Sequence, residues 1–204
     1  MFDTALKTVA AKSGVKHTIF GQFFTKPMTT GAICASSPEL SKLITEGIGV
    51  ENASCVVELG PGTGAVTGFI AKAISDKTKF FAVELNRDMY VAIKHRFPNV
   101  KVYNDCASNL PELLAKEGFA HADSIISGLP WASFPDELQE DILSAIVKAL
   151  PVGGSFATFA YLQGTLLPAG RNFKKRLKRH FSKVEKSKVI WFNIPPAFVY
   201  RCWK

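Results

Sequence analysis

A glycine-rich turn constrains the fold of this chain more than any other feature. The segment Val56–Gly64 reads Val-Val-Glu-Leu-Gly-Pro-Gly-Thr-Gly, so a short apolar run leads directly into glycines at alternate positions. A strand that enters such a turn and then a helix is typical of a ligand-binding crossover in an α/β sheet. Gly60 and Gly62 permit backbone angles that other residues avoid, and the following helix offers free N–H groups at its start.

Short apolar runs alternate with helical stretches through the middle of the chain. The strand-like runs are 55–59, 80–85, 100–103, 124–127 and 155–161, and the helical stretches between them are 65–75, 87–96, 109–117 and 136–149. Alternation of this kind predicts βαβ units, a mostly parallel sheet and right-handed crossovers.

Two more strand-like runs follow a basic helix near residues 169–181. They are Lys186–Phe192 and Ala197–Trp203, and Asn193-Ile194-Pro195-Pro196 must form the turn between them. A terminal hairpin puts an antiparallel strand at the edge of the sheet. The sequence therefore predicts an α/β fold: a doubly wound, seven-stranded, Rossmann-like sheet with an antiparallel C-terminal hairpin and N-terminal helices.

Residues 1–50 form a separate helical segment in this prediction, and residues 51–204 form the sheet domain. Ser37, Pro38 and Glu39 are typical of a helix N-cap, a proline at the first helical position and an acidic first turn. The cysteines form no C-x-x-C pair, and no run of eighteen uncharged apolar residues occurs. We therefore expect reduced cysteines in a cytoplasmic protein, with no metal site, no transmembrane helix and no secretory signal.

Three acidic residues, Glu58, Glu84 and Asp105, come at the ends of the first three predicted strands in order. A carboxylate after the second strand can accept both hydroxyls of a ribose. Asp105 is placed to accept a hydrogen bond from an adenine amino group, although a lone acid after a strand is more often a helix cap. Three acids in register are more specific than the glycines alone.

A dinucleotide site is the main alternative, because Gly60-x-Gly62-x-x-Ala65 also fits the looser dinucleotide fingerprint. Two features count against it. Glu58 lies two residues before the first glycine, where methyltransferases keep an acid that holds the methionine amino group of their cofactor. About fifty residues also precede this strand, whereas a dinucleotide fold often opens with it.

The fourth predicted strand ends in Ser127-Gly128-Leu129-Pro130-Trp131. Methyltransferases that act on nitrogen carry an Asn-Pro-Pro-Tyr-like tetrad in this loop, and Leu129-Pro130-Trp131 resembles the Leu-Pro-Tyr of rRNA adenine dimethyltransferases. In such a loop, backbone carbonyls accept the target N–H and the aromatic ring braces the nucleophile. A Pro-Trp turn packed only for stability is the alternative.

Taken together, the motifs resemble those of bacterial phosphatidylethanolamine N-methyltransferases of the soluble, membrane-associating type. The resemblance runs through nearly the whole chain, and it rests on Thr30-Gly31-Ala32-Ile33, Ser36-Ser37, Glu58–Gly64, Ser127–Trp131 and Asn193–Tyr200. The family commonly holds a proline just before the two serines, where this chain has Cys34-Ala35, a difference that affects only the local loop shape.

The resemblance implies a class I methyltransferase that uses S-adenosyl-L-methionine and releases S-adenosyl-L-homocysteine. It implies methyl transfer to the amine of phosphatidylethanolamine, and to its mono- and dimethyl derivatives, towards phosphatidylcholine. The cofactor carboxylate would lie near Ser36 and Ser37, and residues 1–50 would act as a membrane-associating segment and cofactor lid. The cofactor-binding residues would be Ser36, Ser37, Glu58, Gly60, Gly62, Gly64, Glu84, Leu85, Asp105, Cys106 and Ser127.

The formal net charge of +8 favours an anionic partner. A basic amphipathic helix carries part of this charge, with Phe173, Leu177 and Phe181 on its apolar side. We expect an anionic membrane surface and a phospholipid substrate as partners, with the protein held peripherally at the inner face of the cell membrane. The expected membrane-facing residues are Arg171, Lys174, Lys175, Arg176, Lys178 and Arg179, together with Phe20, Phe23 and Phe24.

A solvated helix face and nucleic-acid binding are the alternatives for the same basic helix. Two other functions stay open in consequence: an rRNA adenine N6-methyltransferase, and a non-catalytic membrane-binding scaffold with a methyltransferase fold. The RNA enzymes usually add a separate helical domain, for which the residues after the fifth strand leave little room. The intact acids and glycines count against the scaffold.

Methyl transfer to an amine requires its neutral form, because a free ammonium with a pKa of about 10 is mostly protonated. Gly128 and Leu129 are expected to provide carbonyl acceptors for the amine. Trp131 is expected to hold the developing cation over its ring face, and Tyr161 or Tyr200 to serve as a base.

Overall fold

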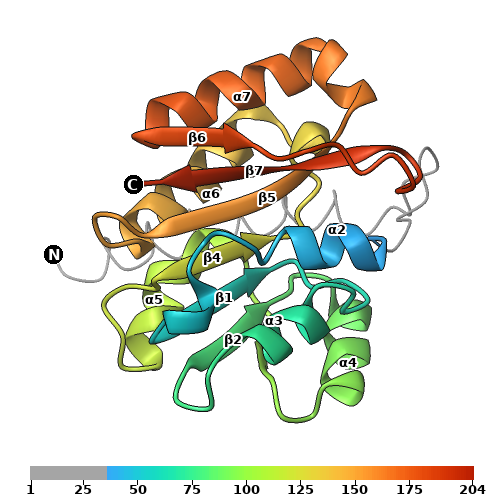
Figure 1. Ribbon diagram of the computed structural model, residues 1–204. Coiled ribbons are helices and arrows are strands. Elements are labelled where there is room, and N and C mark those ends of the chain that lie inside the picture. The colour runs from blue at the N-terminus through green and yellow to red at the C-terminus, as the bar shows by residue number, and fades with distance from the viewer. Residues whose placement is uncertain (1–35) are drawn as a thin grey trace, which may run out of the picture. The chain divides into compact units, whose positions relative to one another are not determined.

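The computed structural model describes residues 36–204, which form a seven-stranded sheet flanked by helices (Figure 1). The order across the sheet is β3-β2-β1-β4-β5-β7-β6. Strands β1 to β5 are parallel, and β7 runs antiparallel to both β5 and β6. This is the fold that the sequence predicts. The strands are β1 (Cys55–Leu59), β2 (Lys79–Val83), β3 (Lys101–Tyr103), β4 (Ser124–Ser127), β5 (Ser155–Tyr161), β6 (Lys183–Lys186) and β7 (Ala197–Trp203).

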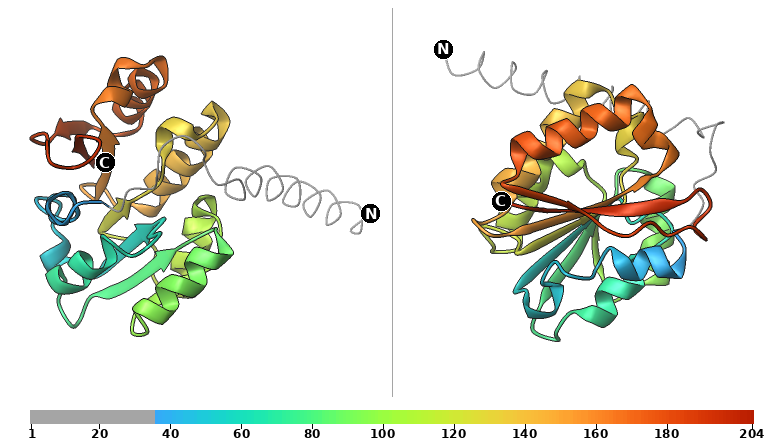
Figure 2. Two further views of the ribbon diagram at one scale, coloured as in Figure 1. Left: turned by 90° about the vertical axis from the view of Figure 1, so that its right-hand side faces the viewer. Right: turned by 45° about the horizontal axis from the view of Figure 1, so that its top comes forward.

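Helices cover both faces of the sheet. On one face, Leu40 of the first described helix and Ile70 of the next pack in one apolar cluster with Val56 of β1. On the other face, Phe156 of β5 stacks on Phe181 with 5.5 Å between ring centroids. The helices are α2 (Pro38–Leu43), α3 (Thr67–Ala73), α4 (Arg87–Arg96), α5 (Leu110–Lys116), α6 (Asp136–Ala149) and α7 (Pro168–His180). The turned views in Figure 2 show α6 and α7 on the same side of the sheet, where they pack against each other.

Strands β1, β4, β5 and β7 have the bounds that the sequence predicts, because each is a continuous and mostly buried run. The prediction of a strand at Lys186–Phe192 is wrong, since β6 spans Lys183–Lys186. Beyond it the Ser187 hydroxyl accepts the N–H of Val199 at 2.9 Å, so a side chain replaces the backbone acceptor and the regular ladder stops. The apolar residues after Ser187 therefore enter a loop.

Helix α2 begins as predicted, with the Ser37 hydroxyl accepting the Leu40 N–H at 3.2 Å and Pro38 in the first turn. It ends at Leu43, and turns follow. The predictions for Phe20, Phe23 and Phe24 and for Thr30–Ile33 lie outside the described residues. The division of the chain at residue 50 stays a prediction. None of the helices within residues 36–204 is long and apolar enough to cross a membrane.

Candidate functional site

The predicted cofactor residues after β1, β2, β3 and β4 lie at one edge of the sheet. β1 and β4 are neighbours, yet the chain continues from β1 to β2 on one side and from β4 to β5 on the other. Ligands of open α/β sheets bind beyond the carboxyl ends of the strands at such a reversal of strand order. We call this side of the sheet, where β1 to β5 end, the carboxyl edge, and the side where they begin the amino edge.

The glycine turn is shaped by close contact between the loops after β1 and β4. Gly60 and Gly62 have φ angles of +69° and +53°, in the left-handed region that side chains rarely adopt. A Cβ at Gly60 would lie 2.7 Å from Cδ2 of Leu129, and one at Gly128 would lie 2.5 Å from the Gly60 carbonyl oxygen. A Cβ at Gly62 would meet no atom of the described residues within 4 Å. Gly60 therefore lets the loops pack, whereas Gly62 leaves its backbone open to a ligand.

Glu58 on β1 is buried, with 1 % of its surface exposed. Its Oε2 accepts a hydrogen bond from the Thr67 hydroxyl at 2.7 Å, and no cation of residues 36–204 forms an ion pair with it. Burial raises the pKa of Glu58 to about 8; the Thr67 hydrogen bond opposes this shift, and the nearby Glu84 carboxylate adds to it. A buried carboxyl group with no cationic partner fits a ligand that brings an ammonium group.

Glu84 connects the glycine turn to the end of β2. Its Oε2 accepts the Gly62 N–H at 3.1 Å, and its Oε1 accepts the Asn86 N–H at 2.9 Å. Burial raises the pKa of Glu84, although these hydrogen bonds oppose the shift. Each carboxylate oxygen has two acceptor sites, so Glu84 can still accept hydrogen bonds from a ribose. The neighbouring Leu85 carbonyl accepts the Asn104 side-chain amide at 3.0 Å, which joins the ends of β2 and β3.

Asp105 follows β3 and holds the next turn. Its Oδ1 accepts the Cys106 N–H at 2.7 Å and the Asn109 side-chain amide at 2.8 Å. These contacts stabilise the turn after β3, and they involve one of the two carboxylate oxygens. Cys106 is buried beside it, where burial raises the pKa of the thiol. The adenine-binding roles of Asp105 and Cys106 stay predictions.

Trp131 is a packing residue in this structure. Its indole N–H lies 3.2 Å from the Ser127 hydroxyl and 3.1 Å from the Thr158 hydroxyl. The ring stacks on Phe173 at 4.9 Å between centroids, and 3 % of the residue is exposed. The expectation that Trp131 offers an open ring face to a cation is wrong for this conformation, because neighbouring side chains cover the ring. Trp131 instead connects the loop after β4 to β5 and α7.

The loop after β4 is also held to β1 by its backbone. The Gly128 N–H donates to the Leu59 carbonyl oxygen at 2.8 Å, and the Leu129 carbonyl oxygen accepts the Trp131 N–H at 3.0 Å. Leu129 is buried against Gly60. The predicted carbonyl acceptors therefore lie on a rigid loop beside the glycine turn.

Ser36 and Ser37 lie at the start of α2 and contact the C-terminal hairpin. The Ser37 N–H donates to Oδ1 of the buried Asn193 at 3.0 Å, and the Asn193 amide donates to the Pro195 carbonyl oxygen at 2.7 Å. Two predicted family motifs, 156 residues apart in the sequence, thus meet in the fold.

The two candidate bases lie on neighbouring strands. Tyr161 ends β5 opposite Ala197 and packs edge-on against Phe159 at 5.6 Å between centroids. Tyr200 is buried on β7 and packs edge-on against Phe173 at 6.3 Å. Burial raises the pKa of Tyr200, so its phenol stays neutral and is poorly suited to take up a proton.

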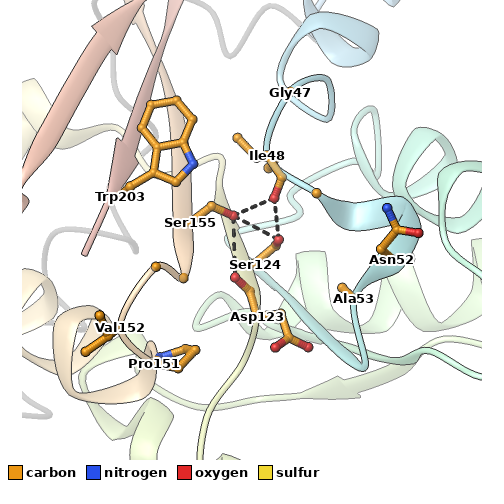
Figure 3. Close-up of a pocket in the computed structure, with 13 residues that line it drawn as sticks. Gly47, Ile48, Asn52, Ala53, Asp123, Ser124, Pro151, Val152, Ser155 and Trp203 are labelled. Carbon is orange, nitrogen blue, oxygen red and sulfur yellow. Dashed lines mark hydrogen bonds between the residues drawn. The ribbon is translucent and has the colours of Figure 1, made fainter.

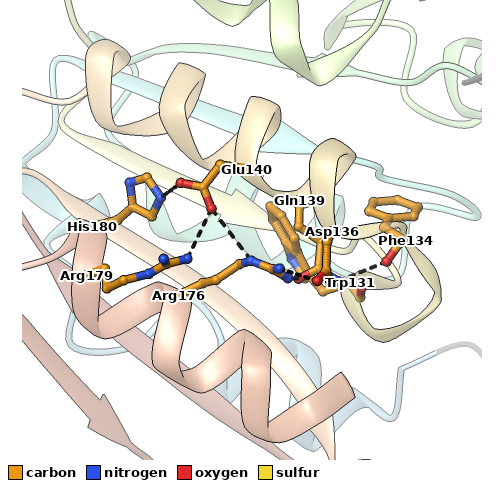
Figure 4. A network of polar contacts seen from close by, with 8 residues as sticks. All are labelled: Trp131, Phe134, Asp136, Gln139, Glu140, Arg176, Arg179 and His180. Atoms are coloured by element: carbon orange, nitrogen blue, oxygen red, sulfur yellow. Dashed lines mark hydrogen bonds and ion pairs between the residues drawn. The ribbon is translucent and has the colours of Figure 1, made fainter. Parts of the chain in front are cut away.

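The basic helix α7 divides into paired and unpaired cations. Arg176 pairs with Asp136 at 2.7 Å and hydrogen-bonds to the Gln139 side chain at 2.8 Å, both on α6 (Figure 4). Arg179 reaches Glu140 of α6 at 3.3 Å. The expectation that Arg176 faces a membrane is wrong, because 11 % of its side chain is exposed. The remaining cations are exposed and form no ion pair within residues 36–204: Arg171, Lys174, Lys175 and Lys178.

A hollow of about 410 Å³ lies at the amino edge (Figure 3). Its walls include Ser124 at the start of β4 and Ser155 at the start of β5, whose hydroxyls donate to the Ile48 carbonyl oxygen at 2.7 and 2.6 Å. These polar groups satisfy one another, and the hollow is on the opposite side of the sheet from the glycine turn. Neither here nor elsewhere in the described part of the chain do three or more His, Cys, Asp or Glu side chains gather to hold a metal ion.

Two polar residues have supporting roles in the site that the sequence did not predict. Thr67 is the hydrogen-bond partner of Glu58, and Asn193 joins the hairpin to α2. A hydroxyl in the first turn of a mostly apolar helix is a signal for Thr67, since it lies nine residues after Glu58. Asn193 stands in a segment that the sequence analysis assigned to a turn, where asparagine is common for local reasons.

A relative is similar to this protein over nearly the whole chain. No protein-family model matches. The chain is 32 % identical over 188 residues to an ornithine lipid N-methyltransferase of Singulisphaera acidiphila, covering 89 % of this chain and 92 % of that protein. It is 31 % identical over 93 residues to the ribosomal RNA small subunit methyltransferase A of Alkaliphilus metalliredigens, covering 43 % of this chain and 31 % of that protein.

Solved structures of methyltransferases share the fold. An O-methyltransferase from Bacillus cereus in complex with SAH superimposes with a TM-score of 0.66 and 13 % identity over 82 % of each chain. The O-methyltransferase TomG from Streptomyces achromogenes, in complex with SAM, has a TM-score of 0.65 and 17 % identity over 84 % of this chain and 82 % of that one. At these identities the likeness establishes the fold alone, and it agrees with the strand order of the sheet.

Proposed function

The chain belongs to the lipid N-methyltransferase family of S-adenosylmethionine-dependent enzymes, and we propose that it methylates the headgroup amine of phosphatidylethanolamine towards phosphatidylcholine. The observation that carries this proposal is the relationship to an ornithine lipid N-methyltransferase over nearly the full length of both chains. The motifs that resemble phosphatidylethanolamine N-methyltransferases, which include Ser36-Ser37 and Asn193–Tyr200, favour phosphatidylethanolamine as the headgroup.

The carboxyl edge offers hydrogen-bond acceptors that suit S-adenosylmethionine. Glu58 would receive the methionine ammonium, because it is a buried carboxyl group with no cationic partner among residues 36–204. Glu84 would accept the ribose hydroxyls, and the open backbone at Gly62 would let the ligand approach. Asp105 would accept from the adenine amino group through the oxygen that does not cap the turn. When bound, the cofactor supplies a methyl group activated by its sulfonium.

The loop after β4 would receive the lipid amine. The carbonyls of Gly128 and Leu129 would accept N–H groups of the amine and so orient its lone pair. Burial of the amine beside this loop would lower its pKa, because a low-polarity environment disfavours the ammonium form. Trp131 would act indirectly, by fixing the loop through its contacts with Ser127 and Thr158.

Peripheral association with the inner face of the cell membrane is part of the proposal. Its support is the face of α7 that carries Arg171, Lys174, Lys175 and Lys178, which are exposed and have no ion-pair partner among residues 36–204. Unpaired cations on one helical face attract anionic lipid headgroups. The segment that contains Phe20, Phe23 and Phe24 is proposed to contribute apolar contacts.

An rRNA adenine N6-methyltransferase is the second candidate. The observation that favours it is the partial similarity to ribosomal RNA small subunit methyltransferase A, together with the Leu129-Pro130-Trp131 loop. The similarity covers 31 % of that protein, whereas the lipid enzyme is matched over 92 % of its length. The lipid acceptor is therefore the better supported of the two.

The proposal is tested by incubating the full-length protein with methyl-labelled S-adenosylmethionine and three separate acceptors. These are mixed micelles with phosphatidylethanolamine, mixed micelles with ornithine lipid, and a structured rRNA fragment. We expect label in phosphatidylethanolamine and its methylated derivatives. Label confined to ornithine lipid would replace the headgroup, and label confined to RNA would overturn the lipid acceptor altogether.

A further inference from the structure

The carboxyl edge carries an unusual concentration of exposed apolar side chains. Residues 36–204 contain seven large apolar residues with high exposure, and five of them lie at this edge. They occur in the loop between β6 and β7 and in the connection from β5 to α7. We call these five residues the apolar rim: Leu166 (71 % exposed), Leu167 (59 %), Trp191 (66 %), Phe192 (92 %) and Ile194 (77 %).

The β6–β7 loop is firmly held although its apolar side chains face outwards. Ile190 and Ala197 close it with backbone hydrogen bonds of 2.7 and 3.2 Å. Asn193, the polar residue in the middle of the loop, is the one that points inwards, and its hydrogen bond to the Ser37 N–H fixes it there. The loop therefore reverses the usual arrangement, with its amide buried and its aromatic and aliphatic side chains in solvent. Contiguous exposed apolar surface of this kind marks an interaction site.

The two parts of the apolar rim lie at the same edge as the glycine turn. β5 ends at Tyr161, which pairs with Ala197 at the start of β7, and the Leu162 N–H donates to the Pro196 carbonyl oxygen at 2.8 Å. The connection to α7 and the β6–β7 loop therefore leave the sheet side by side. Figure 1 shows the start of α7 and this loop at the same end of the molecule.

We propose that the apolar rim docks the cofactor edge onto a lipid bilayer, with Trp191, Phe192 and Ile194 entering the boundary between headgroups and acyl chains. The inference rests on the proposed function, because an acceptor amine held in a bilayer must meet the carboxyl edge. It adds an anchor that is distinct from residues 1–35 and from the basic face of α7.

The positive charge beside the apolar rim indicates that a lipid bilayer is its binding partner. Arg171, Lys174 and Lys175 lie within the first two turns of α7, which begins at the carboxyl edge directly after Leu167. A helix rises about 1.5 Å per residue, so these cations are within about 10 Å of the helix start, close to the Debye length at physiological salt. Tryptophan and basic residues around an apolar centre are typical of side chains at a membrane interface.

The binding test uses the full-length protein and vesicles of roughly two-thirds phosphatidylcholine and one-third phosphatidylglycerol, which contain no primary amine. The variant Phe192→Ser/Ile194→Ser should bind these vesicles roughly tenfold or more weakly than the wild type in co-sedimentation, because two apolar side chains are lost from the bilayer. Val152→Ser is the matched control. Val152 is 91 % exposed and lies in the turn before β5 at the amino edge, so its variant should bind like the wild type.

Trp191 provides a direct reading of insertion. On the same vesicles its fluorescence should shift to the blue and be quenched by lipids with a spin label on the acyl chain, and the Trp191→Phe protein should lack this component. Equal binding by the wild type and by Phe192→Ser/Ile194→Ser, with Trp191 unquenched, would overturn the proposal. A Trp191 that is already shielded from aqueous iodide in the free protein would also overturn it, by showing that the chain itself or another copy covers the rim.

Methyl transfer measured in parallel separates this inference from the proposed function. The double variant should lose activity on vesicles that contain phosphatidylethanolamine but keep it on short-chain phosphatidylethanolamine in solution, since a soluble substrate reaches the site without bilayer docking. Rim-dependent vesicle binding by a protein that methylates no lipid would leave the docking inference standing and defeat the proposed function. Full methylation of vesicle lipid by the double variant would support the proposed function and defeat the docking inference.

Discussion

Two glutamates at opposite edges of the sheet show how differently one fold treats the same side chain. Glu58 at the carboxyl edge has the Thr67 hydroxyl as its hydrogen-bond partner, and burial raises its pKa to about 8. Glu117, after α5, pairs with Lys79 and Lys101 at the starts of β2 and β3. Burial alone would raise its pKa, but hydrogen bonds from both lysines and from a tyrosine lower it to about 2.

This difference shows that carboxyl groups at the amino edge stabilise the fold, whereas those at the carboxyl edge are available to a ligand. At the amino edge, carboxylates are satisfied by the protein itself: Asp123 accepts the N–H groups of Ser54 and Cys55 at 2.7 and 3.0 Å. At the carboxyl edge, neither Glu58 nor Glu84 has a cationic partner among residues 36–204, so burial makes ionisation of both carboxyl groups costly. A ligand that supplies the ammonium and hydroxyl groups removes this cost.

The largest effect on cofactor affinity is expected from a substitution in the glycine turn, compared with a control glycine at the amino edge. Gly60→Val should weaken S-adenosylmethionine binding by about 100-fold or more, because it adds left-handed strain of about 1–2 kcal/mol and drives a side chain into Leu129. Gly153→Val is the control, since Gly153 has a φ of +81° with no described atom near its Cβ. Gly153→Val should lower stability without changing the affinity. Calorimetric titration of both variants checks this, and normal affinity in Gly60→Val would refute the site.

Replacing each of the two glutamates with glutamine should affect a different property of the protein, cofactor affinity for Glu58 and stability for Glu117. Glu58→Gln should weaken cofactor binding by about 1.5–3 kcal/mol, the value of a hydrogen bond to a charged group, and leave the stability of the free protein unchanged or higher. Glu117→Gln should leave the affinity unchanged and lower the free energy of unfolding by about 1–2 kcal/mol, because Lys79 and Lys101 lose their partner. Urea unfolding combined with cofactor titration measures both, and similar profiles for the two variants would abolish the contrast between the edges.

The pH dependence of stability should follow the same contrast. Glu58 is protonated in the folded protein up to about pH 8 but ionises near pH 4 when unfolded, so it makes the free protein less stable as pH rises through this window. Glu117 has a folded pKa of about 2, so its stabilisation is present above about pH 4 and is lost as pH falls towards 2. Unfolding free energies of the wild type and both Gln variants across pH should show the loss between about pH 4 and 8 disappear in Glu58→Gln and the loss below about pH 4 disappear in Glu117→Gln.

The smallest effect is expected at Asp105, where capping and cofactor binding coincide. Asp105→Asn keeps an oxygen for the Cys106 N–H but replaces the second acceptor oxygen with an NH2 donor, so the affinity should fall by about 1 kcal/mol with little change in stability. Equilibrium titration with S-adenosylhomocysteine resolves a change of this size. An unchanged affinity would assign Asp105 to the turn alone.

Much of the sheet and the position of the cofactor edge could be predicted because local signals decide them. The runs Cys55–Leu59 and Ser124–Ser127 are apolar and buried throughout, and the glycines and acids stand directly after strands. Which side chains are covered depends instead on contacts between distant segments. Arg176 resembles its basic neighbours in sequence, yet α6 provides it with Asp136 as a partner.

The sequence also does not predict whether the aromatic side chains of Trp131 and of the Trp191–Phe192 run are covered. Trp131 resembles a substrate-facing tryptophan in sequence, but Phe173 from α7 covers it. The run that ends in Trp191 and Phe192 is apolar enough to predict a buried strand, yet the Ser187 hydroxyl interrupts the ladder and Asn193 turns the loop so that these side chains face outwards. A hydrophobic pattern gives the tendency to be buried, and only packing decides whether the residue is covered.

Proton release on cofactor binding tests the central claim most directly. At about pH 6.5 Glu58 is protonated in the free protein, and the α-amino group of the cofactor, with a pKa near 8, carries its proton. Pairing the two as carboxylate and ammonium must release close to one proton. Titration calorimetry in buffers of different ionisation enthalpy measures the number of protons released. We predict this release for the wild type, with none and a weaker affinity for Glu58→Gln. Equal affinities and no proton release in either protein would contradict the assignment of the carboxyl edge as the S-adenosylmethionine site.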